Sequence, residues 1–182
     1  MNETALTELR TLSTGFRHRY LDYATLTRQL QNWARHYPQL AHLQSLGRSP
    51  EGRDLWLVTV GVEPRRPRPA VWVDGNLHAV ELAGSSVALA IAEDALALHL
   101  APEHALRGLS ANVCETARGV LFHIMPRISP DGAEQLLTSG RYVRSVPRDP
   151  RPTKAGAHWR GVDVDGDGQV LRMRVEDPAG RF

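Results

Sequence analysis

A short apolar segment followed closely by a long one constrains the fold of this chain more than any other feature. Residues 70–73 read Ala-Val-Trp-Val, which is typical of a strand buried on both faces. After a turn at Gly75, residues 80–100 are rich in alanine and apolar on most sides, which predicts a long helix packed against a sheet. Glu93, Asp94 and His99 interrupt its most apolar part, residues 82–100, so we interpret it as a buried helix and not as a membrane span.

The rest of the chain alternates between strand-like and helix-like patterns. Apolar residues recur every second position in some segments and every third or fourth in others, which predicts strands and helices respectively. The expected strands cover residues 43–46, 55–60 and 119–125, and the expected helices cover residues 24–36, 103–117 and 133–137. Gly47–Gly52 has the composition of a hairpin loop, and residues 145–161 that of a longer loop. This alternation predicts an α/β domain with a mixed β-sheet and flanking helices.

Composition narrows the class of protein. The chain has 182 residues, of which 42% are hydrophobic, and a formal net charge of +2, which fits one folded domain or most of one. Its arginines gather in proline-rich stretches without an aromatic stacking platform, so no nucleic-acid partner is expected. The single cysteine, Cys114, excludes an internal disulfide bond. Residues 1–19 lack the apolar core of a signal peptide, so we expect a soluble, cytoplasmic protein without a membrane partner.

A histidine and a glutamate follow the predicted strand at residues 70–73. His78 and Glu81 are three positions apart, so a helix that began at the preceding turn would place both side chains on one face. Imidazole nitrogen and carboxylate oxygen are both zinc ligands, and a hydrolytic site leaves one position of the metal open for water. The alternative is that Glu81 serves the dipole at the start of a helix and His78 is a polar loop residue.

A second polar segment follows the predicted strand at residues 119–125. Ser129-Pro-Asp-Gly132 has the chemistry of a turn, because proline fixes one backbone angle and Asp-Gly tolerates a reversal. Arg144 comes twelve residues after Gly132. A guanidinium held near a zinc ion could stabilise the negative charge of an oxyanion, whereas the alternative is a surface arginine in a basic loop.

An acidic segment near the end of the chain resembles the start of a calcium loop. Asp163, Asp165 and Asp167 occupy positions 1, 3 and 5 of such a loop, and Gly168 occupies position 6. Position 12, where a bidentate glutamate is expected, is Arg174. The sequence therefore leaves two interpretations open, a calcium site or a turn rich in aspartate.

Taken together, these motifs resemble the metallocarboxypeptidase family of zinc exopeptidases. Asn76 to Glu81 is similar to the family's first zinc signature, H-x-x-E, and Pro126 to Gly132 is similar to its Asn-Pro-Asp-Gly segment, with serine where asparagine is usual. Arg144 lies at the spacing of the family's carbonyl-polarising arginine, and Gly47 to Arg53 matches its entry hairpin. The resemblance covers about residues 20–182.

The resemblance implies a zinc-exopeptidase-like fold and a zinc-dependent carboxypeptidase that cleaves C-terminal residues from peptides. It assigns His78 and Glu81 as zinc ligands and Arg144 as the catalytic, oxyanion-stabilising residue. The family's third zinc ligand, a histidine, and its general base, a glutamate, have no match after Arg144, so we expect them beyond Phe182. Residues 1–182 are accordingly expected to form an incomplete, N-terminal part of the catalytic domain, with an insertion-like segment at 153–182 and little activity alone.

Two other functions are consistent with the same residues. The chain could be a zinc amidohydrolase that acts on acylated amino acids or cell-wall peptides, since such an enzyme would share the zinc ion and the arginine. It could also be a non-catalytic binding module in which Asp163 to Asp167 hold calcium. The sequence indicates neither the preferred C-terminal residue of a substrate nor the oligomeric state.

Overall fold

The computed structural model describes residues 2–102, 106, 108–145, 147, 163 and 166–168. Its four strands are β1 (Ala41–Arg48), β2 (Asp54–Val60), β3 (Ala70–Asp74) and β4 (Leu121–Met125). They form one sheet in the order β1-β2-β4-β3, in which β3 and β4 are parallel and the other neighbours are antiparallel. The mixed sheet confirms the predicted fold class.

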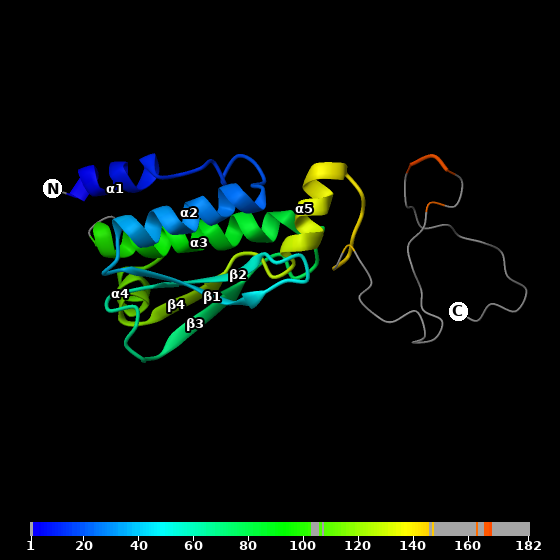
Figure 1. Cartoon of the computed structure of the whole chain (residues 1–182). Coiled ribbons are helices and arrows are strands. Elements are labelled where there is room, and N and C mark those ends of the chain that lie inside the picture. Colours follow the sequence, from blue (N-terminus) through cyan, green and yellow to red (C-terminus); the bar gives the residue numbers. More distant parts are fainter. Residues whose placement is uncertain are drawn as a thin grey trace, which may run out of the picture.

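Five helices accompany this sheet in the described part of the chain. They are α1 (Asn2–Thr11), α2 (Tyr23–His36), α3 (Leu82–Leu100), α4 (Ala111–Gly119) and α5 (Pro130–Ser139). Figure 1 shows α2 and α3 side by side along one face of the sheet, with α5 at the end where β4 finishes. α2 contacts β1 and β2, and α3 contacts β2, β3 and β4, so this pair of helices covers the sheet on that side.

The hydrophobic core lies between the two long helices and the sheet. Leu30 and Trp33 of α2 are fully buried against Val58 and Val60 of β2 and Ile124 of β4. On the inner strand β2, Val58 and Val60 belong to the core cluster and Trp56 packs against it, which is the alternation expected for one face of a strand. This layer fixes the ends of β3 and β4, from which the polar segments of the site begin.

Helix α3 is apolar on most sides, and it packs against the sheet on one side and against α1 and α4 on others. Its length and mean hydropathy would allow it to cross a membrane, but half of its most apolar window is buried inside the protein. Leu89 and Leu96 lie in the core, and the one deeply buried charge on this helix, Glu93, accepts a 2.7 Å hydrogen bond from Arg17. The expectation of a buried core helix is therefore confirmed.

The prediction for residues 70–73 is wrong in one respect. β3 is a strand, but it is the last strand of the sheet, and Val71 and Trp72 are 45% and 52% exposed. An all-apolar segment does not distinguish a central strand from an edge strand, because strand order is set by long-range pairing.

Other element boundaries also differ from the predictions. Of the expected helix 103–117, part lies outside the described residues, and the observed helix α4 starts at Ala111, where Ser110 caps it by accepting from the Val113 N–H. α5 starts at Pro130 and not at residue 133, since proline is well suited to the first helical position. α1 was not predicted, and β1 extends from Ala41 to Arg48.

Candidate metal centre

The turn that carries the candidate ligands is built by a close backbone approach. Gly75 follows β3, its N–H donates to the Met125 carbonyl of β4, and its own carbonyl accepts from the Ile128 N–H. A Cβ atom on Gly75 would lie 2.3 Å from the carbonyl oxygen of Gly84 in α3, so only glycine fits. The backbone at Gly75, just after β3, therefore packs directly against the first turn of α3. The His78–Glu81 segment connects these two parts of the chain.

His78 and Glu81 face each other within this turn. The Glu81 N–H donates to the His78 carbonyl at 2.9 Å, which closes a single turn just before α3 begins at Leu82. Oε1 of Glu81 lies 2.7 Å from Nδ1 of His78, and Oε2 accepts from the His78 backbone N–H at 3.1 Å. These hydrogen bonds hold the pKa of Glu81 below its ordinary value, because they stabilise the carboxylate.

This geometry differs from both sequence interpretations in detail. The two side chains converge as predicted, but from a turn that precedes α3 and not from the helix itself. Glu81 occupies the N-cap position of α3, yet its carboxylate makes no capping hydrogen bond to that helix and turns to His78. A carboxylate at the N-cap still lies at the positive end of the helix dipole, so the dipole interpretation of Glu81 stays open beside the metal interpretation.

Arg144 reaches the same histidine from the opposite side. Its NH2 group lies 2.8 Å from Nε2 of His78, and its backbone carbonyl accepts from the Ala79 N–H at 2.6 Å. A guanidinium has no acceptor and an ionised carboxylate has no donor, so one neutral tautomer satisfies both contacts. In that tautomer Nδ1 of His78 donates to Glu81, and Nε2 accepts from Arg144. The structure thus brings together all three residues that the sequence selected.

The segment after β4 holds these pieces against one another. The Ser129 N–H donates to the Asn76 carbonyl at 3.1 Å, and the Ser129 hydroxyl donates to the Leu77 carbonyl at 2.6 Å. A Cβ atom on Gly132 would lie 2.2 Å from the carbonyl oxygen of Ser145 and 2.5 Å from Cβ of Ala79. Gly132 is therefore the point at which α5, the His78–Glu81 turn and the Arg144 segment touch.

Two further residues of this region were not singled out by their chemistry in the sequence. Asp131 is buried and accepts hydrogen bonds from the Ser49 hydroxyl, the Glu51 N–H and the Arg53 guanidinium, at 2.7, 3.0 and 2.7 Å. It fastens the β1–β2 hairpin loop to α5, whereas the sequence indicated only a turn there. A buried carboxylate requires hydrogen-bond donors, so the sequence could have suggested that Asp131 has partners. It could not identify them, because they lie about eighty residues away in the chain.

Arg127 is the second such residue. It is buried at the end of β4, donating to the Ser85 hydroxyl of α3 at 3.2 Å and to the Leu21 carbonyl at 2.8 Å. Burial lowers the pKa of the Arg127 guanidinium to about 10, because the charged form loses its hydration. Arg127 therefore joins the entry to α2, the first turns of α3 and the end of β4 beneath the candidate metal centre.

The His78–Glu81 pair fits a zinc ion in chemistry and in spacing. Zinc binds imidazole nitrogen and carboxylate oxygen at about 2.0–2.2 Å, so two such ligand atoms of a tetrahedral ion lie about 3.3–3.6 Å apart. The observed distance of 2.7 Å between Nδ1 and Oε1 would have to open by somewhat under about 1 Å. Binding through Nδ1 would also place the imidazole proton on Nε2, which would then no longer accept a hydrogen bond from Arg144. Within the described part of the chain, no group of three His, Cys, Asp or Glu side chains could hold a metal.

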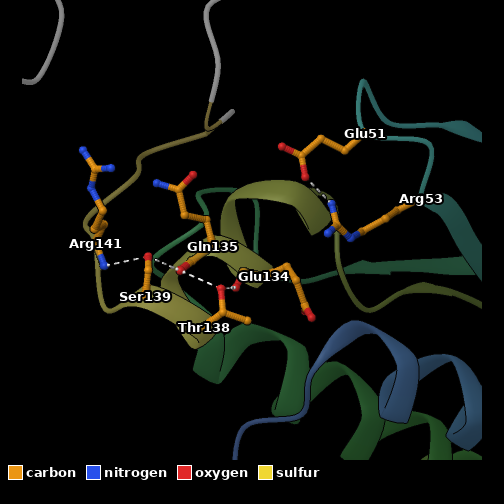
Figure 2. Close-up of a pocket in the computed structure, with 7 residues that line it drawn as sticks. All are labelled: Glu51, Arg53, Glu134, Gln135, Thr138, Ser139 and Arg141. Carbon is orange, nitrogen blue, oxygen red and sulfur yellow. Dashed lines mark hydrogen bonds and ion pairs between the residues drawn. The ribbon is translucent and has the colours of Figure 1, made fainter.

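A surface cleft lies beside the β1–β2 hairpin loop and α5, and His78, Glu81 and Arg144 do not line it. It has a volume of about 490 Å³ and is lined by Glu51, Arg53, Glu134, Gln135, Thr138, Ser139 and Arg141. Figure 2 shows that its polar groups bond to one another and to the backbone, as when Arg53 pairs with Glu51 and the Ser139 hydroxyl donates to the Gln135 carbonyl. Its lining contains none of the three residues of the candidate metal centre, so we assign no chemistry to it.

The candidate calcium segment is described only in part. Oδ1 and Oδ2 of Asp163 accept from the backbone N–H groups of Gly166 and Gly168, at 2.8 and 2.9 Å. This is the pattern of an aspartate-stabilised turn, which also occurs inside calcium loops. Asp165 lies outside the described residues, as does most of the insertion-like segment 153–182, so the calcium site stays a prediction.

Comparison with known proteins connects this geometry to a family. The sequence model of the zinc carboxypeptidase family matches residues 26–167. Human carboxypeptidase A6 is 31% identical over 146 residues, which are 78% of this chain and 30% of the relative. Carboxypeptidase B from Astacus astacus is 30% identical over 127 residues, which are 70% of this chain and 38% of the relative. This chain thus spans about a third of the length of these relatives.

Solved structures agree on the fold. A crystal structure of thrombin-activatable fibrinolysis inhibitor aligns with a TM-score of 0.65 at 19% identity, covering 80% of this chain and 34% of that one. Carboxypeptidase A from Helicoverpa armigera aligns with a TM-score of 0.56 at 22% identity, covering 86% and 36%. Both alignments support an α/β exopeptidase fold, of which the described chain forms part. The comparisons do not favour the amidohydrolase or the non-catalytic alternative.

Proposed function

Because this chain belongs to the zinc carboxypeptidase family, we propose that it supplies part of the active site of a zinc-dependent carboxypeptidase that removes C-terminal residues from peptides. In this proposal His78 and Glu81 are two of the zinc ligands, and Arg144 stabilises the oxyanion of the reaction. The observation that supports it best is the contact of His78 with Glu81 on one side and with Arg144 on the other, at 2.7 and 2.8 Å.

Each of these residues has a distinct task. Glu81 and His78 present an oxygen and a nitrogen to the same point, and Glu81 stays ionised because hydrogen bonds from His78 lower its pKa. Arg144 is exposed and positively charged beside that point, where it can donate hydrogen bonds to a peptide carbonyl oxygen as negative charge develops. When bound, zinc would polarise that carbonyl and lower the pKa of a coordinated water molecule.

Two groups that such a reaction needs are still to be assigned. A third protein ligand and a general base are not placed beside His78 by any described residue. We propose that they come from residues outside the described part or from a further segment of polypeptide. Two ligands alone bind zinc weakly, so the isolated chain is expected to show little peptidase activity.

Zinc binding by the purified 182-residue chain tests the ligand assignment directly. We expect one zinc site whose affinity falls at least tenfold in His78→Ala and in Glu81→Gln, measured by competition with a chromophoric chelator. His36→Ala is the matched control, because this exposed histidine at the end of α2 contacts the Asn32 carbonyl and lies outside the candidate metal centre. Equal affinities in all three variants and the unaltered chain would remove the metal assignment.

Activity should be assayed on the gene product isolated from its source cells. A peptide with a free C-terminal carboxylate, the same peptide with an amidated C-terminus, and an N-acyl amino acid form a sufficient panel. A carboxypeptidase trims only the first of these, with zinc dependence and with a large loss in Arg144→Ala. Cleavage of the N-acyl amino acid without peptide trimming would instead favour the amidohydrolase.

A further inference from the structure

Asn76 lies two residues before the His78–Glu81 turn of the candidate metal centre and has an uncommon backbone conformation. Its φ is +56°, and its side chain is almost completely buried, at 2% exposure. Among the described residues, only Glu63 shares a positive φ without being glycine. Asparagine tolerates this conformation better than most residues, but glycine would adopt it without strain. Conformation alone therefore does not account for an amide side chain here.

The amide group of Asn76 bonds to the turn itself. Nδ2 donates to the His78 carbonyl at 2.9 Å and to the Ala79 carbonyl at 3.1 Å, so both of its protons are used. The His78 carbonyl also accepts from the Glu81 N–H, which means that one oxygen ties Asn76 to both ends of the His78–Glu81 turn. This side chain thus bonds to two consecutive carbonyls next to the candidate ligands.

Asn76 is in turn held rigidly. Its backbone carbonyl accepts from the Ser129 N–H, and a Cβ atom on Gly84 would lie 2.8 Å from its backbone nitrogen. Its Oδ1 is buried without a hydrogen-bond partner among the described residues. A buried acceptor without a partner is unfavourable for stability, so the favourable contribution of this amide comes from the contacts of its Nδ2.

From these contacts we infer that Asn76 is a positioning residue of the metal centre, acting through the backbone carbonyls of His78 and Ala79. It holds the turn in the shape that directs Nδ1 of His78 and Oε1 of Glu81 to one point. This inference rests on the proposed function for its consequence, which is metal affinity, but its geometric content can be measured without metal.

The variant Asn76→Gly separates the amide from the backbone conformation. Glycine accepts φ of +56° and removes only the side chain. Because residues that orient metal ligands typically change affinity by 10–100-fold, we expect zinc affinity to fall at least tenfold. The visible spectrum of bound Co²⁺ should change as well, since it reports the coordination geometry. Asn76→Asp keeps the shape but turns a donor into an acceptor facing two carbonyl oxygens, and it should lose more affinity.

Glu63→Gly is the matched control, because it also replaces a residue of positive φ by glycine and thereby relieves the same backbone strain, but in an exposed loop. It should leave zinc affinity and the Co²⁺ spectrum unchanged, and thermal melting should show that both glycine variants are folded. If Asn76→Gly binds zinc within twofold of the unaltered chain and gives the same Co²⁺ spectrum, the inference is overturned.

A measurement on the metal-free chain keeps the test of Asn76 distinct from the test of the proposed function. If the unaltered chain shows no zinc binding that depends on His78, the proposed metal centre fails, and amide hydrogen exchange then decides the role of Asn76. Faster exchange of the Ala79 and Glu81 N–H groups in Asn76→Gly, and not in Glu63→Gly, would support positioning of the turn. Unchanged exchange at both groups would overturn it.

Discussion

Substitution of Gly132 by alanine should disrupt the point at which three parts of the candidate site touch. A Cβ atom there would lie 2.2 Å from the carbonyl oxygen of Ser145 and 2.5 Å from Cβ of Ala79. Ordinary van der Waals contact begins at 3.4 Å, so the Ser145 carbonyl would have to move by 3.4 − 2.2 = 1.2 Å. Both neighbours are parts of the main chain or attached directly to it, and neither can rotate away.

The energetic cost follows from how that overlap is relieved. Overpacking of a tight interior site costs about 1–3 kcal/mol. Release of the Arg144–Ser145 segment would instead break the 2.6 Å hydrogen bond from the Ala79 N–H to the Arg144 carbonyl, which costs about 1 kcal/mol. Alanine is the better helix former by up to about 1 kcal/mol, but Gly132 lies in the first turn of α5, where that gain is small. We expect a net destabilisation of about 1–3 kcal/mol.

Urea denaturation measures this change, with Gly119→Ala as the control. Gly119 lies in α4, is exposed, and a Cβ atom there would meet nothing within 4 Å, so alanine should be neutral or slightly stabilising. Hydrogen exchange of the Ala79 amide should accelerate in Gly132→Ala and not in the control. If the two variants unfold at the same urea concentration with the same Ala79 exchange, the close packing at Gly132 is refuted.

Three other predictions test the surroundings of the site. Asp131→Ala should lower the free energy of unfolding by about 3 kcal/mol, because it removes the acceptor of the Ser49 hydroxyl and of the Glu51 N–H and one of the two carboxylates that pair with Arg53. Glu51→Ala should cost under about 1 kcal/mol in the same urea titration. The pKa of Asp22 is lowered by hydrogen bonds from Thr25, so its contribution is present above the unfolded-state pKa and lost as pH falls through the folded one. Asp22→Ala should therefore cost about 1 kcal/mol at pH 7 and progressively less in unfolding measurements below about pH 4. Because β3 is an exposed edge strand, we expect the isolated chain to self-associate through it. Trp72→Lys places a charge on this edge and should reduce the concentration-dependent association measured by sedimentation. Unchanged association would exclude β3 as the contact surface.

The sequence was sufficient wherever the deciding interactions are local. α2, α3 and the β1–β2 hairpin follow from hydrophobic period and turn residues, and each observed boundary lies within about two residues of the predicted one. His78 and Glu81 are three positions apart, so a single tight turn was enough to bring their side chains within 2.7 Å. The chain needed no distant contact for that convergence.

Tertiary structure decided what depends on residues far apart in the chain. Arg144 meets His78 across 66 positions, and Asp131 meets Ser49 across 82, through packing at Gly132 and the hairpin loop. Within the described part of the chain β4 is the one strand that pairs with β3, which makes β3 an edge strand there, and no local pattern of apolar residues indicates this. Local spacing fixes contacts within one turn through the backbone itself, whereas these contacts exist only once the sheet, α3 and α5 have packed together.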